Sequence, residues 1–102
     1  MQIQIENHGN TAVIQLAGQF VFASHKALRD ACRSLLMDSA TNCIQLEMSR
    51  VEYLDSSALG MLLLMKEKLT SAGKEIQIKG AQGLVLQVLE VVKFDRMFTL
   101  LH

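Results

Sequence analysis

The sequence contains no proline, no tryptophan and only two cysteines, Cys32 and Cys43, in 102 residues. The cysteines are expected to be buried and have no metal-ligand spacing, so we expect no metal site and a reducing cytoplasm as the compartment. The longest uninterrupted apolar run, Met61 to Met65, is far shorter than the roughly 20 residues that cross a bilayer. The N-terminus lacks the basic and apolar regions of a secretion signal, and we expect no membrane insertion.

Neither sign of charge is in excess. The 10 Lys and Arg residues balance the 10 Asp and Glu residues, and the basic residues are scattered singly. A nucleic-acid interface needs a clustered basic face to neutralise phosphates, so we expect no nucleic-acid partner.

Hydrophobic residues make up 50% of the sequence. A chain of this length and content can bury one core, which predicts a single domain over residues 1–102.

Alternation of apolar and polar residues with a period of two predicts strands in four places. The second of these strands follows a turn signal centred on Gly9, so the first two are expected to form a hairpin. The other strands are separated by helical segments, which predicts parallel neighbours with right-handed crossovers. The four predicted strands are residues 2–6, 11–17, 43–48 and 75–79.

Three segments show helical periodicity. An apolar stripe over residues 28–35 follows Ser24, whose hydroxyl we expect to cap the helix by accepting from a backbone N–H two or three residues on. Residues 56–70 predict a second helix that ends at Gly73, the residue best suited to a left-handed stop. A third stripe covers residues 84–92.

The order of elements predicts an α/β fold. An N-terminal hairpin followed by βα units gives a mixed sheet of four to five strands, since residues 94–100 could form a short last strand or a turn. Three of the strands have one apolar and one polar face. A sheet covered on both faces would instead show continuous apolar runs, so we expect the helices mainly on one face.

The connection before the second helix carries Leu54-Asp55-Ser56-Ser57-Ala58-Leu59-Gly60. One interpretation is a helix cap, because Asp or Ser at a helix start satisfies free N–H groups and complements the helix dipole. A second interpretation is a regulated hydroxyl, because the same N–H groups and dipole stabilise an attached phosphate. A phosphoserine would add about −1.5 to −2 charges beside Asp55.

The run from Asp55 to Gly60, followed by Met-Leu-Leu-Leu, resembles the signature of STAS-domain proteins of the anti-sigma factor antagonist type. The family pattern is Asp-Ser-(Ser/Thr)-Gly-Leu-Gly followed by an apolar helix. The resemblance covers essentially the whole chain, and the predicted order of strands and helices agrees with it. Further matches are Leu16 to Phe20, Ile44 to Met48, Gly73-Lys74 and Leu89 to Phe94.

In that family a partner kinase phosphorylates the serine directly after the Asp, which is Ser56 here, with Ser57 as the second choice. The resemblance implies a cytoplasmic regulator without catalytic activity or a required cofactor, and we expect a monomer or weak dimer. Unphosphorylated, it would bind and sequester an anti-sigma factor with serine-kinase activity or a similar regulator. Phosphorylation at Ser56 would release that partner, and a serine phosphatase would restore binding. The expected partner-binding residues are Phe22, Ser24, Asp55, Ser56, Ser57, Ala58, Met61, Leu64 and Met65.

Two departures from the family pattern bear on this expectation. Ala58 replaces the usual Gly and should firm the first helical turn, because Ala is the better helix former. Residues 20–25 replace a loop that often carries an Asp and that lies near the phosphorylated serine in the family. The apolar helix itself has two interpretations: a deeply buried central helix, or one on which some of Met61, Leu64 and Met65 face out as a docking patch.

Two other functions compete with the switch. Some STAS proteins serve as constitutive accessory subunits on the ATPase of an ABC-type lipid transporter, where the helix patch matters and phosphorylation need not. A hydrolase using Ser56 is the third hypothesis, but no general base stands at a defensible spacing. His8, His25 and His102 lie in an expected turn, a first helical turn and the C-terminus, and they support no Ser–His–Asp triad.

Overall fold

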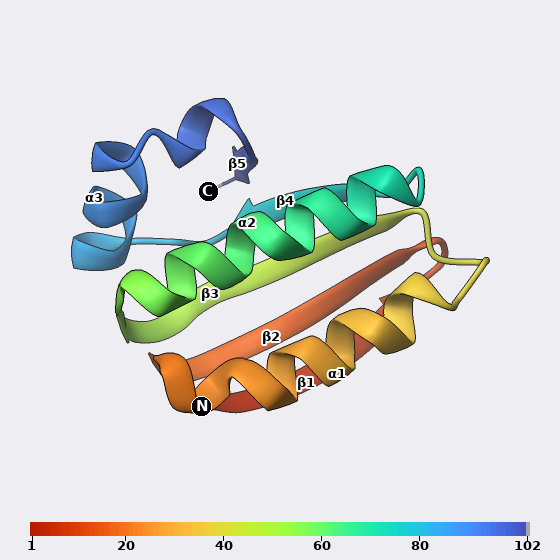
Figure 1. Cartoon of the computed structure of the whole chain (residues 1–102), viewed down its shortest axis with the longest axis horizontal. Helices are drawn as coiled ribbons and strands as arrows, with labels where there is room; N and C mark the ends of the chain where they lie inside the picture. Colours follow the sequence, from red (N-terminus) through yellow and green to blue (C-terminus); the bar gives the residue numbers. More distant parts are fainter. Residues whose placement is uncertain (102) are drawn as a thin grey trace.

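A five-stranded sheet carries three α-helices and two short 3₁₀ turns in the computed structural model, which describes residues 1–101 (Figure 1). The predicted α/β fold is confirmed, and the tail, left open between a strand and a turn, forms a 3₁₀ turn followed by a short fifth strand. The elements are β1 (Gln2–His8), β2 (Thr11–Phe20), η1 (Phe22–Ser24), α1 (His25–Leu36), β3 (Cys43–Leu54), α2 (Ser56–Ser71), β4 (Glu75–Lys79), α3 (Gly83–Val91), η2 (Phe94–Arg96) and β5 (Thr99–Leu101).

The strands lie in the sheet in the order in which they occur in the chain, β1-β2-β3-β4-β5. β1 and β2 form the predicted antiparallel hairpin, and Gly9 in its turn has a φ of 65°. This left-handed conformation is one that glycine adopts without steric cost. β2, β3, β4 and β5 are parallel neighbours, as the alternation of strands and helices predicts.

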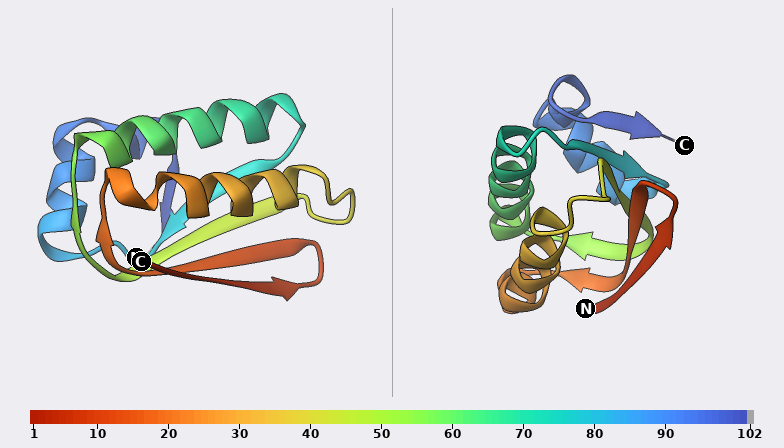
Figure 2. Two further views of the ribbon diagram at one scale, coloured as in Figure 1. Left: turned by 60° about the horizontal axis from the view of Figure 1, so that its bottom comes forward. Right: turned by 90° about the vertical axis from the view of Figure 1, so that its right-hand side faces the viewer.

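Only one face of the sheet is covered by α1 and α2, which run side by side along it (Figure 2). The inward side chains of the central strands are fully buried, among them Ile14, Ile44 and Ile78. The opposite face is polar. There the Gln45 amide donates to Gln77 Oε1 at 2.9 Å, and the Gln15 amide donates to Glu6 Oε1 at 3.0 Å. The prediction of helices mainly on one face is therefore confirmed.

β3 is twice as long as the six-residue strand predicted, because residues 49–54 continue it rather than connect it to the helix. This extension pairs with the end of β2 across two register irregularities, one on either side of the pair Ala17 and Gly18. Such bulges break the period of two, which leaves Val51 and Leu54 buried three residues apart. The longer β3 carries the start of α2 to the end of the sheet, next to α3 (Figure 1).

The opposite end of α2 is closed by Gly73, whose φ is 77°. The Lys74 N–H donates to the Leu69 carbonyl at 2.9 Å and the Gly73 N–H donates to the Thr70 carbonyl at 3.0 Å, which is a Schellman motif. The predicted stop is thus confirmed. Lys74 itself is buried, and its ammonium group donates to the carbonyls of Asp38 at 2.7 Å and Thr41 at 2.5 Å. These bonds hold the α1–β3 loop against the end of the helix.

Candidate functional site

Asp55 is the N-cap of α2 and has extended backbone angles, with a φ of −105° and a ψ of −178°. Its Oδ1 accepts a hydrogen bond from the Ala58 N–H at 2.9 Å. One of the four N–H groups that a helix start leaves without an intrahelical acceptor is thereby satisfied. The cap interpretation is confirmed, with Asp55 rather than a serine supplying the oxygen.

The second oxygen of Asp55 reaches a different segment. Asp55 Oδ2 accepts from the Phe22 N–H at 3.3 Å, and the Asp55 N–H donates to the Phe20 carbonyl at 3.2 Å. The β2–α1 loop is therefore fastened to the start of α2. The expectation that residues 20–25 lie near the candidate switch is confirmed for this chain.

Ser56 and Ser57 are the first two residues of α2, and they differ in exposure. Ser56 is exposed, whereas Ser57 is half-buried. Within residues 1–101 no side chain hydrogen-bonds to the Ser56 hydroxyl. The N–H groups of both serines lie in the first turn, where a helix offers no internal acceptor. An anion on Ser56 would thus stand in water beside free donors and the positive end of the helix dipole.

Large apolar side chains are exposed on the segments that meet at this corner. Phe22 is 70% exposed, Tyr53 47% and Leu84 61%. Phe22 is joined to Asp55 by the hydrogen bond above, and Tyr53 lines a small hollow with Leu84. We name Phe22, Tyr53, Ser56 and Leu84 the switch surface. Apolar side chains gathered on a surface in this way commonly mark a protein interface.

Tyr53 and Leu84 were not among the predicted partner-binding residues. Leu84 belongs to the apolar stripe of α3, but Val85 and Leu89 take the buried face and leave Leu84 pointing outward. The apolar stripe alone does not decide which of two adjacent apolar residues turns outward, so no sequence signal singled out Leu84. Tyr53 lies in the part of β3 that was expected to be a connection, so its facing could not be inferred from alternation.

Ser24 does not cap α1 and is not accessible, which corrects both expectations for it. Its side chain is buried, and its hydroxyl donates to the Gln19 carbonyl at 3.2 Å and accepts from the Val21 N–H at 3.4 Å. The physical reason is the 3₁₀ turn η1, which gives Ser24 a helical φ of −82° and ψ of −5°. A capping hydroxyl requires an extended residue at this position.

Three further predicted contact residues are buried. Ala58 is fully enclosed, while Met61 is 7% and Met65 5% exposed, because these side chains of α2 turn toward the sheet and α1. Ala58 therefore presents no surface to a partner, whereas Met61 and Met65 line a depression between α1 and α2 rather than an outward-facing patch. Leu64 is 43% exposed and is the one of the three docking-patch candidates that faces out. The two interpretations of the helix thus each hold for part of it.

The remaining candidates add no second site. His8 is exposed in the first strand and hydrogen-bonds with Glu6, and His25 begins α1 with its ring edge against Phe22. His102 lies outside the described residues. Within residues 1–101 no cluster of three or more His, Cys, Asp or Glu side chains could hold a metal ion. In the same part of the chain, none of the helices combines the length and apolarity that crossing a bilayer requires.

Comparison with known proteins decides the family. The family model described as "Mlab, STAS domain" matches residues 3–102. The chain belongs to the STAS-domain family. A STAS-domain containing protein of Pseudomonas aeruginosa strain UCBPP-PA14 is 31% identical over 90 residues, covering 88% of this chain and 87% of the relative.

Solved STAS structures share the fold. An anti-sigma factor antagonist from Mycobacterium paratuberculosis superposes with a TM-score of 0.85 at 24% identity, covering 98% of this chain and 84% of that one. The Bacillus cell fate determinant SpoIIAA in its phosphorylated form superposes with a TM-score of 0.75 at 18% identity, covering 97% of this chain and 90% of that one. The order of elements is thus that of a STAS domain over nearly the whole chain.

Proposed function

We propose that this STAS domain is a cytoplasmic partner-switching regulator of the anti-sigma factor antagonist type, controlled by phosphorylation of Ser56. The unphosphorylated form binds an anti-sigma factor with serine-kinase activity or a similar regulator through the switch surface. Phosphorylation releases this partner, and a serine phosphatase restores binding. One observation carries the proposal: the exposed Ser56 stands at the N-terminus of α2, and exposed apolar side chains lie on the segments linked to that corner, Phe22 through its bond to Asp55 and Tyr53 with Leu84 at the end of β3.

The physical basis is the cost of covering a phosphate. A phosphoserine carries about −1.5 to −2 charges, which the N-terminus of α2 stabilises while the site is open to water. A partner packed on Phe22, Tyr53 and Leu84 would have to desolvate that charge next to the Asp55 carboxylate. Burying a charge without a partner costs several kcal/mol, enough to dissociate a complex of ordinary affinity. The structure of SpoIIAA in a phosphorylated form supports the proposal, because the same fold there carries the modification.

Affinity capture followed by mass spectrometry tests the proposal. The baits are the wild type, Ser56→Ala, Ser56→Asp and, as a matched control at the half-buried neighbour, Ser57→Ala. We expect the wild type, Ser56→Ala and Ser57→Ala to recover the same kinase-like partner, and Ser56→Asp to lose it. If Ser56→Asp and Ser56→Ala recover it equally well, Ser56 is not the switch.

A constitutive accessory subunit of an ABC-type lipid transport ATPase is the alternative. The uncovered Phe22, Tyr53 and Leu84 would suit a permanent interface as well as a switched one, because the centres of permanent interfaces are rich in apolar and aromatic residues. The two functions differ in their dependence on Ser56. Recovery of an ABC ATPase by all four baits, without a kinase, would favour the accessory subunit.

We also propose that the domain has no catalytic activity of its own. A serine nucleophile needs a general base within hydrogen-bond reach, and within residues 1–101 no side chain makes such a contact with the Ser56 hydroxyl. An ester probe should therefore be turned over no faster by the wild type than by Ser56→Ala. A rate that disappears in Ser56→Ala would revive the hydrolase hypothesis.

A further inference from the structure

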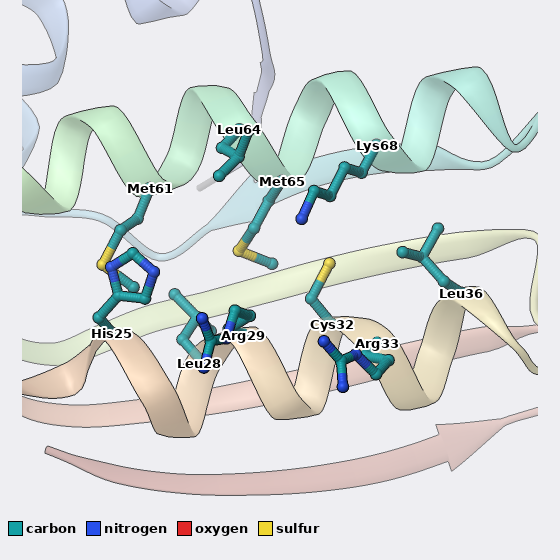
Figure 3. A pocket seen from close by; sticks show the side chains of 10 residues that line it. All are labelled: His25, Leu28, Arg29, Cys32, Arg33, Leu36, Met61, Leu64, Met65 and Lys68. Atoms are coloured by element: carbon teal, nitrogen blue, oxygen red, sulfur yellow. The ribbon is translucent and has the colours of Figure 1, made fainter.

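A second candidate surface is the groove between α1 and α2. Its floor is apolar and is formed by Leu28 and Cys32 of α1 and by Met61 and Met65 of α2 (Figure 3). All four side chains are buried, and Leu64 rises at the rim, 43% exposed. The space between them, open to the surface on one side, has a volume of about 80 Å³. The groove is thus an apolar depression on the helical face of the domain.

The charges around this groove are all of one sign. Arg29 and Arg33 line it from α1 and Lys68 lines it from α2, with His25 at one end, and no Asp or Glu is among the lining residues. Within residues 1–101 the ion pair that forms is His8 with Glu6, so none of the three cations has a carboxylate within 4.0 Å. The chain as a whole has equal numbers of basic and acidic residues. The positive charge at the groove is therefore a local excess.

We propose that the α1–α2 groove binds an amphipathic helix of a partner protein, with one apolar side chain in the cavity and Asp or Glu residues opposite Arg29, Arg33 and Lys68. Two parallel helices form a groove in which a third can pack ridge into groove, and helix-in-groove binding is a recurrent mode of recognition. Arg29 and Arg33 are four residues apart on α1. Their spacing of one helical turn matches that of two acidic residues at i and i+4 on the bound helix.

The size of the cavity favours a helix over a lipid. A cavity of about 150 Å³ accommodates a benzene molecule, so one of about 80 Å³ accommodates a smaller apolar group. That is the scale of a single side chain and not of an acyl chain. The unpaired cations outside the cavity then require an occupant that also presents negative charges about 6 Å apart, the rise of the four residues from Arg29 to Arg33.

A synthetic peptide of about 16 residues tests the proposal directly. It presents a Leu stripe at helical spacing with Glu on both flanks, and a second peptide of the same composition has the stripe scrambled. Amide chemical shifts of the isotope-labelled chain are followed during titration with each peptide. We expect the amphipathic peptide to shift residues 25–36 and 61–68 with a dissociation constant below about 1 mM, and the scrambled peptide to leave them unchanged.

Charge-reversal variants and a variant of the apolar rim then distinguish binding in the groove from non-specific electrostatic attraction of the acidic peptide. Arg29→Glu with Arg33→Glu should raise the dissociation constant of the peptide roughly tenfold, because two exposed ion pairs become repulsive contacts. Lys79→Glu with Lys93→Glu changes the net charge equally at exposed positions outside both helices and should weaken peptide binding less than about twofold. Leu64→Ser removes the exposed apolar rim and should also weaken binding. Equal weakening by both charge reversals would overturn the proposal.

Other occupants of the groove give distinguishable results. If laurate shifts the same residues and the peptide does not, the groove is a lipid site. If the shifts arise from raising the concentration of the chain alone, the occupant is a second copy. No shift in the groove at about 1 mM peptide also overturns the proposal. Ser56→Asp should bind the peptide with a dissociation constant within about twofold of that of the wild type, because salt screens charges that lie beyond about a Debye length. The peptide titration therefore tests the groove independently of whether Ser56 is the switch.

Discussion

Asp55 Oδ2 accepts a hydrogen bond from the Phe22 N–H at 3.3 Å, which joins residues 33 positions apart in the chain. The other oxygen of the same carboxylate caps α2 through the Ala58 N–H at 2.9 Å. One side chain therefore positions both the loop that carries Phe22 and the helix that begins with Ser56. The geometry of the switch surface depends on this carboxylate.

Replacing Asp55 with Ala should lower the free energy of unfolding by about 1–2 kcal/mol, the usual loss for an N-cap. The amide of Phe22 should also exchange its hydrogen faster, because it loses its acceptor. Asp55→Asn is the matched control, since Asn caps helices about as well as Asp. Urea unfolding and hydrogen exchange measure the two effects. Equal stability of Asp55→Ala and the wild type would show that this carboxylate does not hold the corner.

Gly80 is the glycine at which a side chain has least room. Its φ is 77°, and an added Cβ would overlap Glu47 Oε1, which accepts from the Ser49 N–H at 3.0 Å. Gly80→Ala should therefore destabilise by roughly 1–3 kcal/mol, chiefly from backbone strain, with a smaller part from displacing the flexible Glu47 carboxylate. Gly9→Ala has a similar φ of 65° and open space, so it should cost only about 1 kcal/mol.

Combining Gly80→Ala with Glu47→Ala separates the two contributions. The double variant should recover part of the stability lost by Gly80→Ala, because the overlapping carboxylate is gone. Thermal or urea unfolding of the four proteins in the cycle gives the coupling. Strict additivity of the two substitutions would contradict the predicted overlap.

Lys74→Met should cost about 2–3 kcal/mol of unfolding free energy, because the buried ammonium group donates to the carbonyls of Asp38 and Thr41. Lys79→Met is the control at an exposed lysine and should change stability by less than about 0.5 kcal/mol. Both variants can be compared by urea unfolding. Indistinguishable midpoints would mean that the Lys74 hydrogen bonds contribute nothing to the fold.

Cys32 should resist alkylation in the folded protein. Burial raises the pKa of its thiol above the ordinary value of 9.0, against a smaller opposing effect of Lys68. The unfolded chain therefore loses this proton first as the pH rises. The contribution of Cys32 to stability is complete below pH 9.0 and declines at higher pH as the folded thiol titrates.

Mass spectrometry after iodoacetamide treatment at neutral pH should find Cys32 modified far more slowly in the folded than in the urea-unfolded protein, in a Cys43→Ser background that removes the second thiol. Above pH 9.0, the wild type should lose more stability than Cys32→Ala does over the same interval. Rapid modification of the folded protein would show that the floor of the α1–α2 groove is open to solvent.

The fold could be predicted from the sequence because apolar residues recur with clearly different periods in its strands and in its helices. β4 was predicted with its observed bounds, and the polar faces of three strands revealed that the helices cover one side. The second half of β3 was missed because the bulges beside Ala17 and Gly18 change which residues face inward. Alternation cannot be followed across such a change of register.

The candidate site could be predicted from the sequence only in part. The Asp55 cap follows from residue type and position, but the role of Ser24 was wrong because the 3₁₀ turn before α1 turns its hydroxyl back into the loop. Met61 and Met65 were placed on the correct helix without the face being decided. That decision depends on how α2 packs beside α1, which is a tertiary relationship that helical periodicity alone does not contain.

The most direct test of the central claim is the affinity of the captured partner for the chain phosphorylated at Ser56, compared with the unphosphorylated chain. Isothermal titration calorimetry on purified proteins gives both dissociation constants. We expect the phosphate to weaken binding by at least about 100-fold, which corresponds to about 2.7 kcal/mol. Dissociation constants that agree within about twofold would contradict this expectation, because a phosphate on Ser56 could not then lie under the partner.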